Sequence, residues 1–250
     1  MANIVQKGIQ KVAKGMPSFE SILFQAMQVP GVRIEREKYL RAALNMRFSQ
    51  QTIEAAIATT PAAAGITVDQ LSEIADSAIK LEATKTSALS FASGLPGGLA
   101  VLGTVPADIA QFYAFVLRVI QKLAYLYGWP DFFDMNEEDI DDGTMNMFIL
   151  FLGVMTGAAG AEVAVAKVSE KLAATALKRL PEYALTHGVV YPLVKKVATM
   201  LGAQMSKEIF AKGVSKTIPI VGGLISGGVT LATFTPMSRR LKNYLASLQL

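Results

Sequence analysis

The sequence predicts an all-α protein, a multi-helix bundle, on three observations. Apolar residues recur at helical spacing through most of the 250 residues, which is the pattern of amphipathic helices. Sustained alternation of apolar and polar residues between turn signals, the pattern of strands, is nearly absent. Residues that cap helices also stand at several of the expected helix starts.

The best-defined helix begins after Pro106 and ends before Gly128. Asp108 lies in its first turn, where a negative charge meets the positive end of the helix dipole. Gly128 is a suitable C-cap, and Pro130 prevents continuation. The apolar face repeats at helical spacing: Ile109, Phe112, Tyr113, Val116, Ile120, Leu123 and Tyr127.

Two further helix starts precede this helix. Ser49 is expected to cap a helix that stops before Pro61. Thr67 and Gln70 form the pattern of a capping box, with a hydroxyl at the N-cap and an amide three residues later. A long helix is expected from there to about Ser93.

The second half of the chain begins with an acidic connector, 131–142, in which Asn136 is the expected cap of a helix start. An apolar helix over 143–161 and a more polar helical region over 162–180 follow, and the chain closes on a basic helix. We divide the chain into an N-terminal basic helical region, 1–65, and a helical domain, 66–250, which are expected to pack as one unit.

The composition is unusually apolar. Hydrophobic residues make up 52% and charged residues 18%, against about 25% charged in ordinary soluble domains, and the mean hydropathy is +0.37. The core is therefore very large, or part of the surface meets lipid. Cysteine is absent, which excludes disulfides and thiolate metal sites and favours a reducing compartment.

The charge is uneven along the chain. The net charge is +4, but residues 131–142 contain seven acids and no base, whereas residues 143–250 carry +8. A basic half suits an anionic membrane surface or a nucleic acid. The bases stand in pairs beside apolar helices, without Arg-rich runs or interleaved aromatics, so we favour lipid and expect no nucleic-acid partner. The anionic-lipid candidates are Arg239, Arg240 and Lys242.

Three stretches lack charge altogether: 86–107, 143–161 and 217–238. Each has about the 20 residues that a membrane span needs. Small residues recur at four-residue spacing in two of them, which lets helices approach closely. The alternative is a tightly packed helical core. The helix-packing candidates are Gly97, Gly98, Gly153, Gly157, Gly223 and Gly227.

Catalytic signals are weak. His187 is the single histidine, and it is expected at a helix end. Ser77 and Lys80 match a serine–lysine spacing but lack companion motifs. An EF-hand reading of the connector fails, because the sixth position counted from Asp134 is Asp139 and the twelfth is Met145. We expect no enzyme, cofactor or metal.

Asp108 and Glu162 are acids beside apolar stretches, and Asp108 is expected to pair with a base such as Arg118.

A family resemblance covers roughly residues 80–245. The elements Gly94-Leu-Pro-Gly-Gly98, Thr104-Val-Pro-Ala-Asp108, Arg118 and Leu123-Ala-Tyr-Leu-Tyr-Gly128 resemble the hallmark segment of the EcsC family. Ile218-Pro-Ile-Val-Gly-Gly223 with Gly227-Gly228 is similar to its second glycine-rich segment. The resemblance implies a protein that assists or regulates a bacterial ABC-transport system. It makes Asp108, Arg118 and Tyr127 candidates for a shared structural or binding role.

The expected function is that of a non-enzymatic, EcsC-like protein on the cytoplasmic side of the bacterial inner membrane. Its partners would be membrane lipid or a membrane protein, and a homo-oligomer stays open. The alternative is a soluble helical module, located in the cytoplasm, that holds a lipid or another apolar ligand between its helices.

Overall fold

The structure is a computed structural model that describes residues 18–91, 107–133, 139–175, 179–215 and 228–248, with the backbone alone for 85–91, 107–109, 205–215 and 228–233. Within these residues the chain forms ten α-helices and no strand, so the all-α prediction is confirmed. The helices are α2 (Phe19–Met27), α3 (Arg36–Leu44), α4 (Gln50–Ala58), α5 (Val68–Phe91), α6 (Ala107–Leu126), α7 (Asp142–Thr156), α8 (Ala161–Thr175), α9 (Glu182–Thr186), α10 (Tyr191–Ser215) and α11 (Gly228–Leu248).

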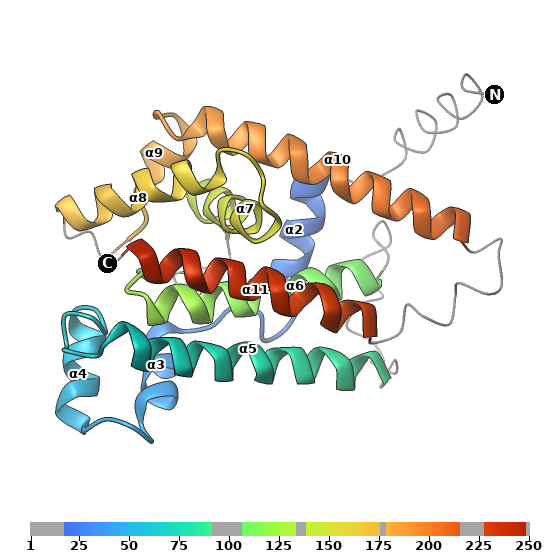
Figure 1. Ribbon diagram of the computed structural model, residues 1–250. Helices are drawn as coiled ribbons and strands as arrows, with labels where there is room; N and C mark the ends of the chain where they lie inside the picture. The colour runs from blue at the N-terminus through green and yellow to red at the C-terminus, as the bar shows by residue number, and fades with distance from the viewer. Residues whose placement is uncertain (1–17, 92–106, 134–138, 176–178, 216–227, 249–250) are drawn as a thin grey trace.

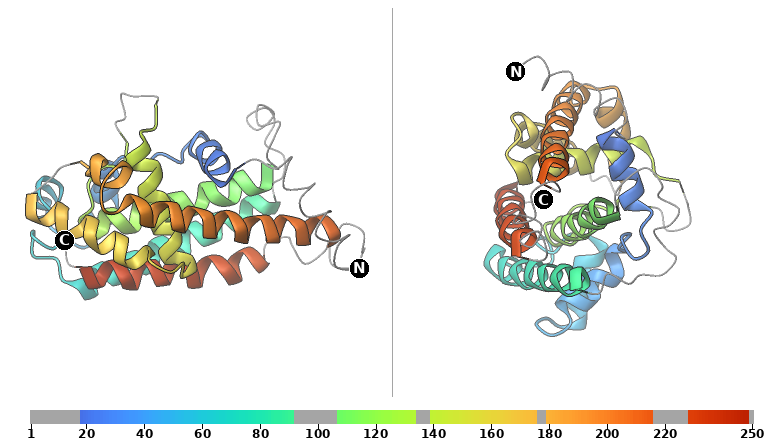
Figure 2. Two further views of the ribbon diagram at one scale, coloured as in Figure 1. Left: turned by 90° about the horizontal axis from the view of Figure 1, so that it is seen from above. Right: turned by 90° about the vertical axis from the view of Figure 1, so that its right-hand side faces the viewer.

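The long helices run along one axis of the bundle. Figure 1 shows α5, α6 and α11 side by side, and all three contact one another. The end-on view in Figure 2 places α10 on one side of the molecule and α5 on the other, with α6 between them. Helices α2 and α3 pack against α6, so residues 18–65 share one core with the helices that follow them.

Helix α7 is the centre of the bundle, and it contacts α8, α9, α10 and α11. Its run of large apolar residues is almost completely buried: Phe148, Ile149, Leu150, Phe151 and Leu152. Trp129 meets Phe151 edge-on with ring centroids 5.0 Å apart, and Phe132 lies 5.0 Å from Phe148. The most hydrophobic of the three charge-free stretches is therefore core.

Several local predictions are confirmed. The Ser49 hydroxyl accepts from the Thr52 N–H at 3.2 Å. Thr67 and Gln70 form both bonds of the capping box, at 3.0 and 3.3 Å, and α5 begins directly afterwards. Gly128 has a φ of 89° just after α6, a conformation that favours glycine and ends a helix.

One prediction is wrong: 143–161 is not a single helix. Helix α7 ends at Thr156 and α8 begins at Ala161, because Gly157 and Gly160 have φ values of 76° and 93°. The N-cap of α7 is Asp141, whose carboxylate accepts from the Thr144 N–H at 2.7 Å. Asn136, expected to cap a helix here, lies outside the described residues.

Candidate functional site

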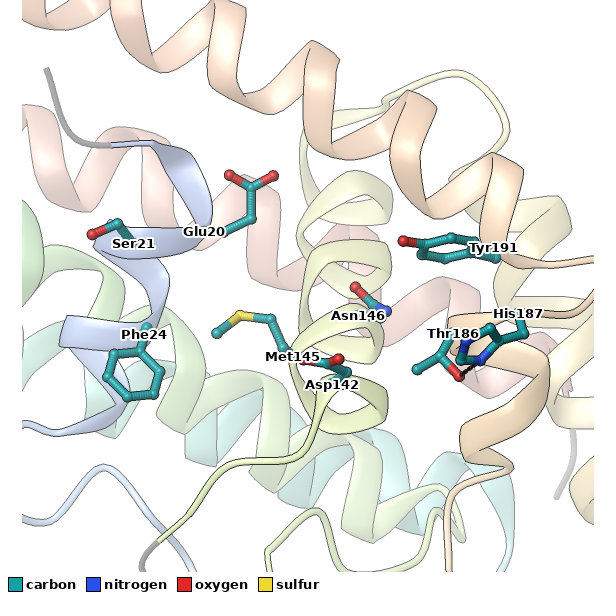
Figure 3. Close-up of a pocket in the computed structure, with 9 residues that line it drawn as sticks. All are labelled: Glu20, Ser21, Phe24, Asp142, Met145, Asn146, Thr186, His187 and Tyr191. Carbon is teal, nitrogen blue, oxygen red and sulfur yellow. Dashed lines mark hydrogen bonds between the residues drawn. The ribbon is translucent and has the colours of Figure 1, made fainter.

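A hollow of about 460 Å³ opens between α2, α7, the end of α9 and the start of α10. Figure 3 shows the side chains around it, with the Tyr191 hydroxyl directed toward its centre. Its lining combines carboxylates, amides, hydroxyls and aromatic rings: Glu20, Ser21, Phe24, Asp142, Met145, Asn146, Thr186, His187 and Tyr191.

Helix caps and one long-range bond hold this lining in place. The Ser18 hydroxyl caps α2 by accepting from the Ser21 N–H at 3.1 Å, which fixes the first turn. The Asn146 side chain donates to the Leu185 carbonyl at 3.1 Å and so ties α7 to α9. The hollow thus lies at a junction of helix ends, where polar capping side chains collect.

His187 follows α9 directly, so its predicted place at a helix end is confirmed. Its ring stacks on Tyr183 with centroids 5.8 Å apart. The Thr186 hydroxyl lies 2.8 Å from Nδ1 and donates to the Glu182 carbonyl at 2.9 Å. Because the hydroxyl has one proton, Nδ1 is assigned as a donor to Thr186. His187 therefore cannot activate Thr186 as a base in this arrangement.

Metal binding finds no support in the part of the chain that the structure describes. No group of three or more His, Asp or Glu side chains lies close enough there to hold an ion. Ser77, in the serine–lysine match, donates its hydroxyl to the Glu73 carbonyl at 2.9 Å, an ordinary bond inside a helix.

The most charged interior point lies between α5 and α6, at Glu82. Its carboxylate is fully buried and accepts from Arg118 Nε at 3.0 Å and from Lys122 Nζ at 2.6 Å. Burial alone would raise the pKa of Glu82, but the hydrogen bonds and charges of Arg118 and Lys122 lower it below its ordinary value. Arg118 also donates to the Gly31 carbonyl, and the Lys122 ammonium lies 5.6 Å from the Tyr39 ring centroid.

Sequence reasoning singled out Arg118 but missed Glu82. The sequence does carry a signal for a buried Glu82. The residue stands at helical spacing from Ala75, Ala78 and Ile79, which are all buried. A carboxylate on that face must meet a base or lose its charge. Asp108 lies in the first turn of α6 as predicted, but its side chain falls outside the description, so its ion pair stays a prediction.

Tyr127, the third family-motif candidate, is buried just after α6 and borders a second hollow of about 260 Å³. Lys242 of α11 lies nearby. Its ammonium donates to Ser72 at 3.1 Å and to Asp76 at 2.8 Å, and its side chain is only 10% exposed. Lys242 thus has an internal partner, which argues against its assignment to anionic lipid.

The other candidates lie at the surface around the start of α8. Glu162 is half-exposed, and its carboxylate is 3.8 Å from the Arg240 guanidinium. Its carbonyl accepts from the Tyr244 hydroxyl, which joins α8 to α11. Arg239 is exposed on α11. Residue 162 therefore lies at the contact of α8 with α11, where its backbone carbonyl is bonded and its carboxylate forms a surface ion pair.

The two described glycine candidates differ from each other. At Gly153, a Cβ atom would lie 2.5 Å from Val197 Cγ1 and 2.7 Å from Ala161 Cβ, so α7 approaches α10 and α8 closely there. Gly157 is the left-handed C-cap of α7 and touches the Arg240 guanidinium. The four-residue spacing thus reflects one packing contact and one helix end. The remaining candidates, Gly97, Gly98, Gly223 and Gly227, lie outside the described residues.

The described residues contain no helix with both the length and the apolar character needed to cross a bilayer. Helix α7 has 15 residues and is about 22 Å long, short of the ~30 Å of hydrocarbon.

Fold and sites together define the class of protein as an all-α bundle with a buried ionic cluster. Comparison of the chain with protein-family models, curated proteins and solved structures finds no match in any of the three. The EcsC resemblance therefore rests on the sequence motifs alone.

Proposed function

We propose that the protein is a non-enzymatic, EcsC-like, membrane-associated protein that contacts the bilayer with one end of its helical bundle. The observation that carries this proposal is the clustering of four helix termini. One end of the molecule holds the end of α5, the start of α6, the end of α10 and the start of α11. This end is on the right in Figure 1 and in the left view of Figure 2.

Two sequence segments join these helices, 92–106 and 216–227, and apart from Lys216 they fall within the charge-free stretches 86–107 and 217–238. Lys216 is the only charged residue in either segment. Helices α5 and α10 therefore end, and α6 and α11 begin, at the same end of the bundle. An apolar side chain transferred into lipid gains about 0.8 kcal/mol for each CH₂ group buried.

Basic residues near this end would strengthen contact with an anionic surface. Lys212 stands in the last turn of α10, and Lys216 follows the helix. A lysine close to an anionic bilayer contributes about 1 kcal/mol. The membrane partner is therefore an anionic lipid surface. The family resemblance extends the proposal to a role in assisting or regulating a transport system at the cytoplasmic side of the bacterial inner membrane.

Flotation of the full-length protein with anionic phospholipid vesicles tests the proposal. Leu102→Asp combined with Ile225→Asp puts a charge into each apolar segment and should abolish flotation. The matched control is Val189→Asp, an exposed apolar position just before α10. The 25 residues of α10 place it about 37 Å from the contacting end, so the control should float like the parent. Equal flotation of both variants would sink the proposal.

The alternative is a soluble module that holds a lipid or another apolar ligand between its helices. The apolar hollow beside Tyr127, about 260 Å³, is smaller than the roughly 300–1,000 Å³ of sites for drug-sized ligands. A lipid would exceed it, which favours membrane contact. Native mass spectrometry of protein purified without detergent distinguishes the two functions, because only the module would carry extracted lipid.

A further inference from the structure

The hollow between α2, α7, α9 and α10 offers hydrogen-bond acceptors that have no donor. Glu20 and Asp142 bring carboxylates to it from the first turns of α2 and α7. Neither carboxylate has a hydrogen bond or an ion pair within the described residues. The lining that these residues form includes no lysine or arginine. The hollow therefore has negative charge without a cation of its own.

The Asn146 amide adds a further acceptor. Its Nδ2 donates to the Leu185 carbonyl at 3.1 Å, and this bond determines which way the amide points. Oδ1 is then directed toward the hollow, as Figure 3 shows. At His187, Nδ1 donates to Thr186, so Nε2 of the neutral ring is also an acceptor. A ligand that matches this lining brings several donors.

The helix dipoles here do not reverse the sign of the charge. Helices α2, α7 and α10 begin beside the hollow, and each start carries about half a positive charge. The two lining carboxylates and Asp141, which caps α7, outweigh these partial charges. A metal ion is not the cation indicated, because no group of His, Asp and Glu side chains among the described residues could hold one. The charge favours an organic cation.

Phe24, Met145 and the Tyr191 ring add apolar surface to the lining, and Phe24 is 46% exposed. The Lys195 ammonium already lies 4.5 Å from the centroid of the Tyr191 ring, so the ring offers a ligand apolar contact and not its only cation. The volume of about 460 Å³ is within the roughly 300–1,000 Å³ of small-molecule sites. The ligand thus has an apolar part as well as a charge.

We propose that this hollow binds a small organic cation in which an ammonium or guanidinium group is attached to an apolar body. An ammonium group has three donors and a guanidinium group five, and neither has an acceptor. The carboxylates of Glu20 and Asp142 and the Asn146 amide oxygen accept from the cationic group. The apolar body lies against Phe24 and Met145.

Three probes that differ in charge test the proposal on the full chain. 2-Phenylethylamine, 2-phenylethanol and 3-phenylpropanoate share a phenyl ring and a two-carbon chain, and they are cationic, neutral and anionic. NMR titration, followed at the methyl groups of Met145 and Thr186, should show the amine binding at least about tenfold more tightly than the alcohol, the value of a hydrogen bond to a charged group. The propanoate should not bind. Equal binding of amine and alcohol, or no shift of these methyl groups with the amine, would overturn the proposal.

Isosteric variants separate the site from general effects on the fold. Glu20→Gln and Asp142→Asn should each weaken the amine about five- to tenfold and leave the affinity for the alcohol unchanged. Asp69→Asn is the matched control, because Asp69 is an exposed acid in the first turn of α5, outside the hollow. It should bind the amine like the parent. An amine affinity that survives in both Glu20→Gln and Asp142→Asn, or that falls equally in Asp69→Asn, would contradict the assignment. The outcome does not depend on the membrane proposal, which concerns the other end of α10.

Discussion

The Glu82 carboxylate, completely buried between α5 and α6, meets the Arg118 guanidinium at two points, with N–O distances of 3.0 and 3.2 Å. Thirty-six residues separate the two in the chain. Arg118 also donates to the carbonyl of Gly31, in the segment between α2 and α3. The pair therefore joins three parts of the chain that are distant in sequence.

Removing the charge of Glu82 should be strongly destabilising. Glu82→Gln leaves two cations, Arg118 and Lys122, beside a neutral amide in the interior. Stranding buried charge in this way typically costs about 3–5 kcal/mol. Urea unfolding at pH 7 measures the loss, and Glu54→Gln is the control, since Glu54 forms an ion pair with Arg41 at the surface. Similar midpoints for the two variants would show that the buried cluster contributes no more than a surface pair.

The contribution of Glu82 should also depend on pH. Burial opposes ionisation, but the bonds from Arg118 and Lys122 prevail and hold its pKa below the ordinary value of 4.5. A carboxyl whose pKa is lower in the folded state stabilises the fold above its unfolded pKa. That stability is lost as the pH falls through the folded pKa. The difference in unfolding free energy between the parent and Glu82→Gln should be constant from pH 7 to 5 and shrink below about 4.5. A difference that does not change down to pH 3 would contradict this sign.

Local features of this fold could be predicted because they depend on neighbours in the sequence. The Thr67–Gln70 capping box, the Ser49 cap and the Gly128 helix end each need only a few adjacent residues to form. The periodic face of α6 likewise follows from one helix alone. These signals determine the helices and the all-α class.

Pairs that form only when helices pack could not be predicted in the same way. Nothing near Glu82 in the sequence indicates that Arg118 will lie opposite, and the run of bases in 239–242 gives no sign that Lys242 turns inward to Asp76. The apolar run of α7 was ambiguous for a related reason. A buried core helix and a membrane helix need the same residues, and only the surrounding helices decide between them.

Gly153 should tolerate no side chain, although alanine favours helices. A Cβ atom there would lie 2.5 Å from Val197 and 2.7 Å from Ala161, and overpacking of this kind costs about 1–3 kcal/mol. Gly202 in α10 is the matched control, because its Cβ would meet Phe19 at an ordinary 3.6 Å. Gly202→Ala should therefore stabilise by about 0.5–1 kcal/mol. Thermal unfolding of both variants checks the opposite signs, and a stabilised Gly153→Ala would show that α7 can shift to make room.

Gly157 should also not tolerate a side chain, in this case because of its backbone conformation. Its φ of 76° is strained for any residue with a Cβ atom, and such strain costs about 1–3 kcal/mol. Gly157→Ala should therefore destabilise the fold even where the Arg240 side chain moves away. Combining it with Arg240→Ala tests this, because a double variant as stable as Arg240→Ala alone would assign the whole cost to the contact.

The basic residues of α11 should differ in their contribution to stability, because Lys242 is buried and paired whereas Arg239 is exposed. Lys242→Met keeps the apolar stem but removes the ammonium that bonds Ser72 and Asp76. Because Asp76 is half-exposed and can rehydrate, the cost should be about 1–2 kcal/mol. Arg239→Gln changes an exposed position and should leave stability within about 0.5 kcal/mol. Chemical unfolding of both variants distinguishes the two groups.

The vesicle affinities of a variant in α11 and a variant in α10 test which part of the bundle meets the membrane. Arg239 stands 11 residues after Gly228, the start of α11, and is therefore about 16 Å from the proposed contact along the helix. This exceeds the Debye length of about 8 Å at physiological salt, so Arg239→Gln should change the affinity for anionic vesicles less than twofold. Lys212→Gln, in the last turn of α10, should weaken it about fivefold, the equivalent of ~1 kcal/mol. The reverse ranking would mean that the bundle lies on the membrane along α11 instead of meeting it with its end.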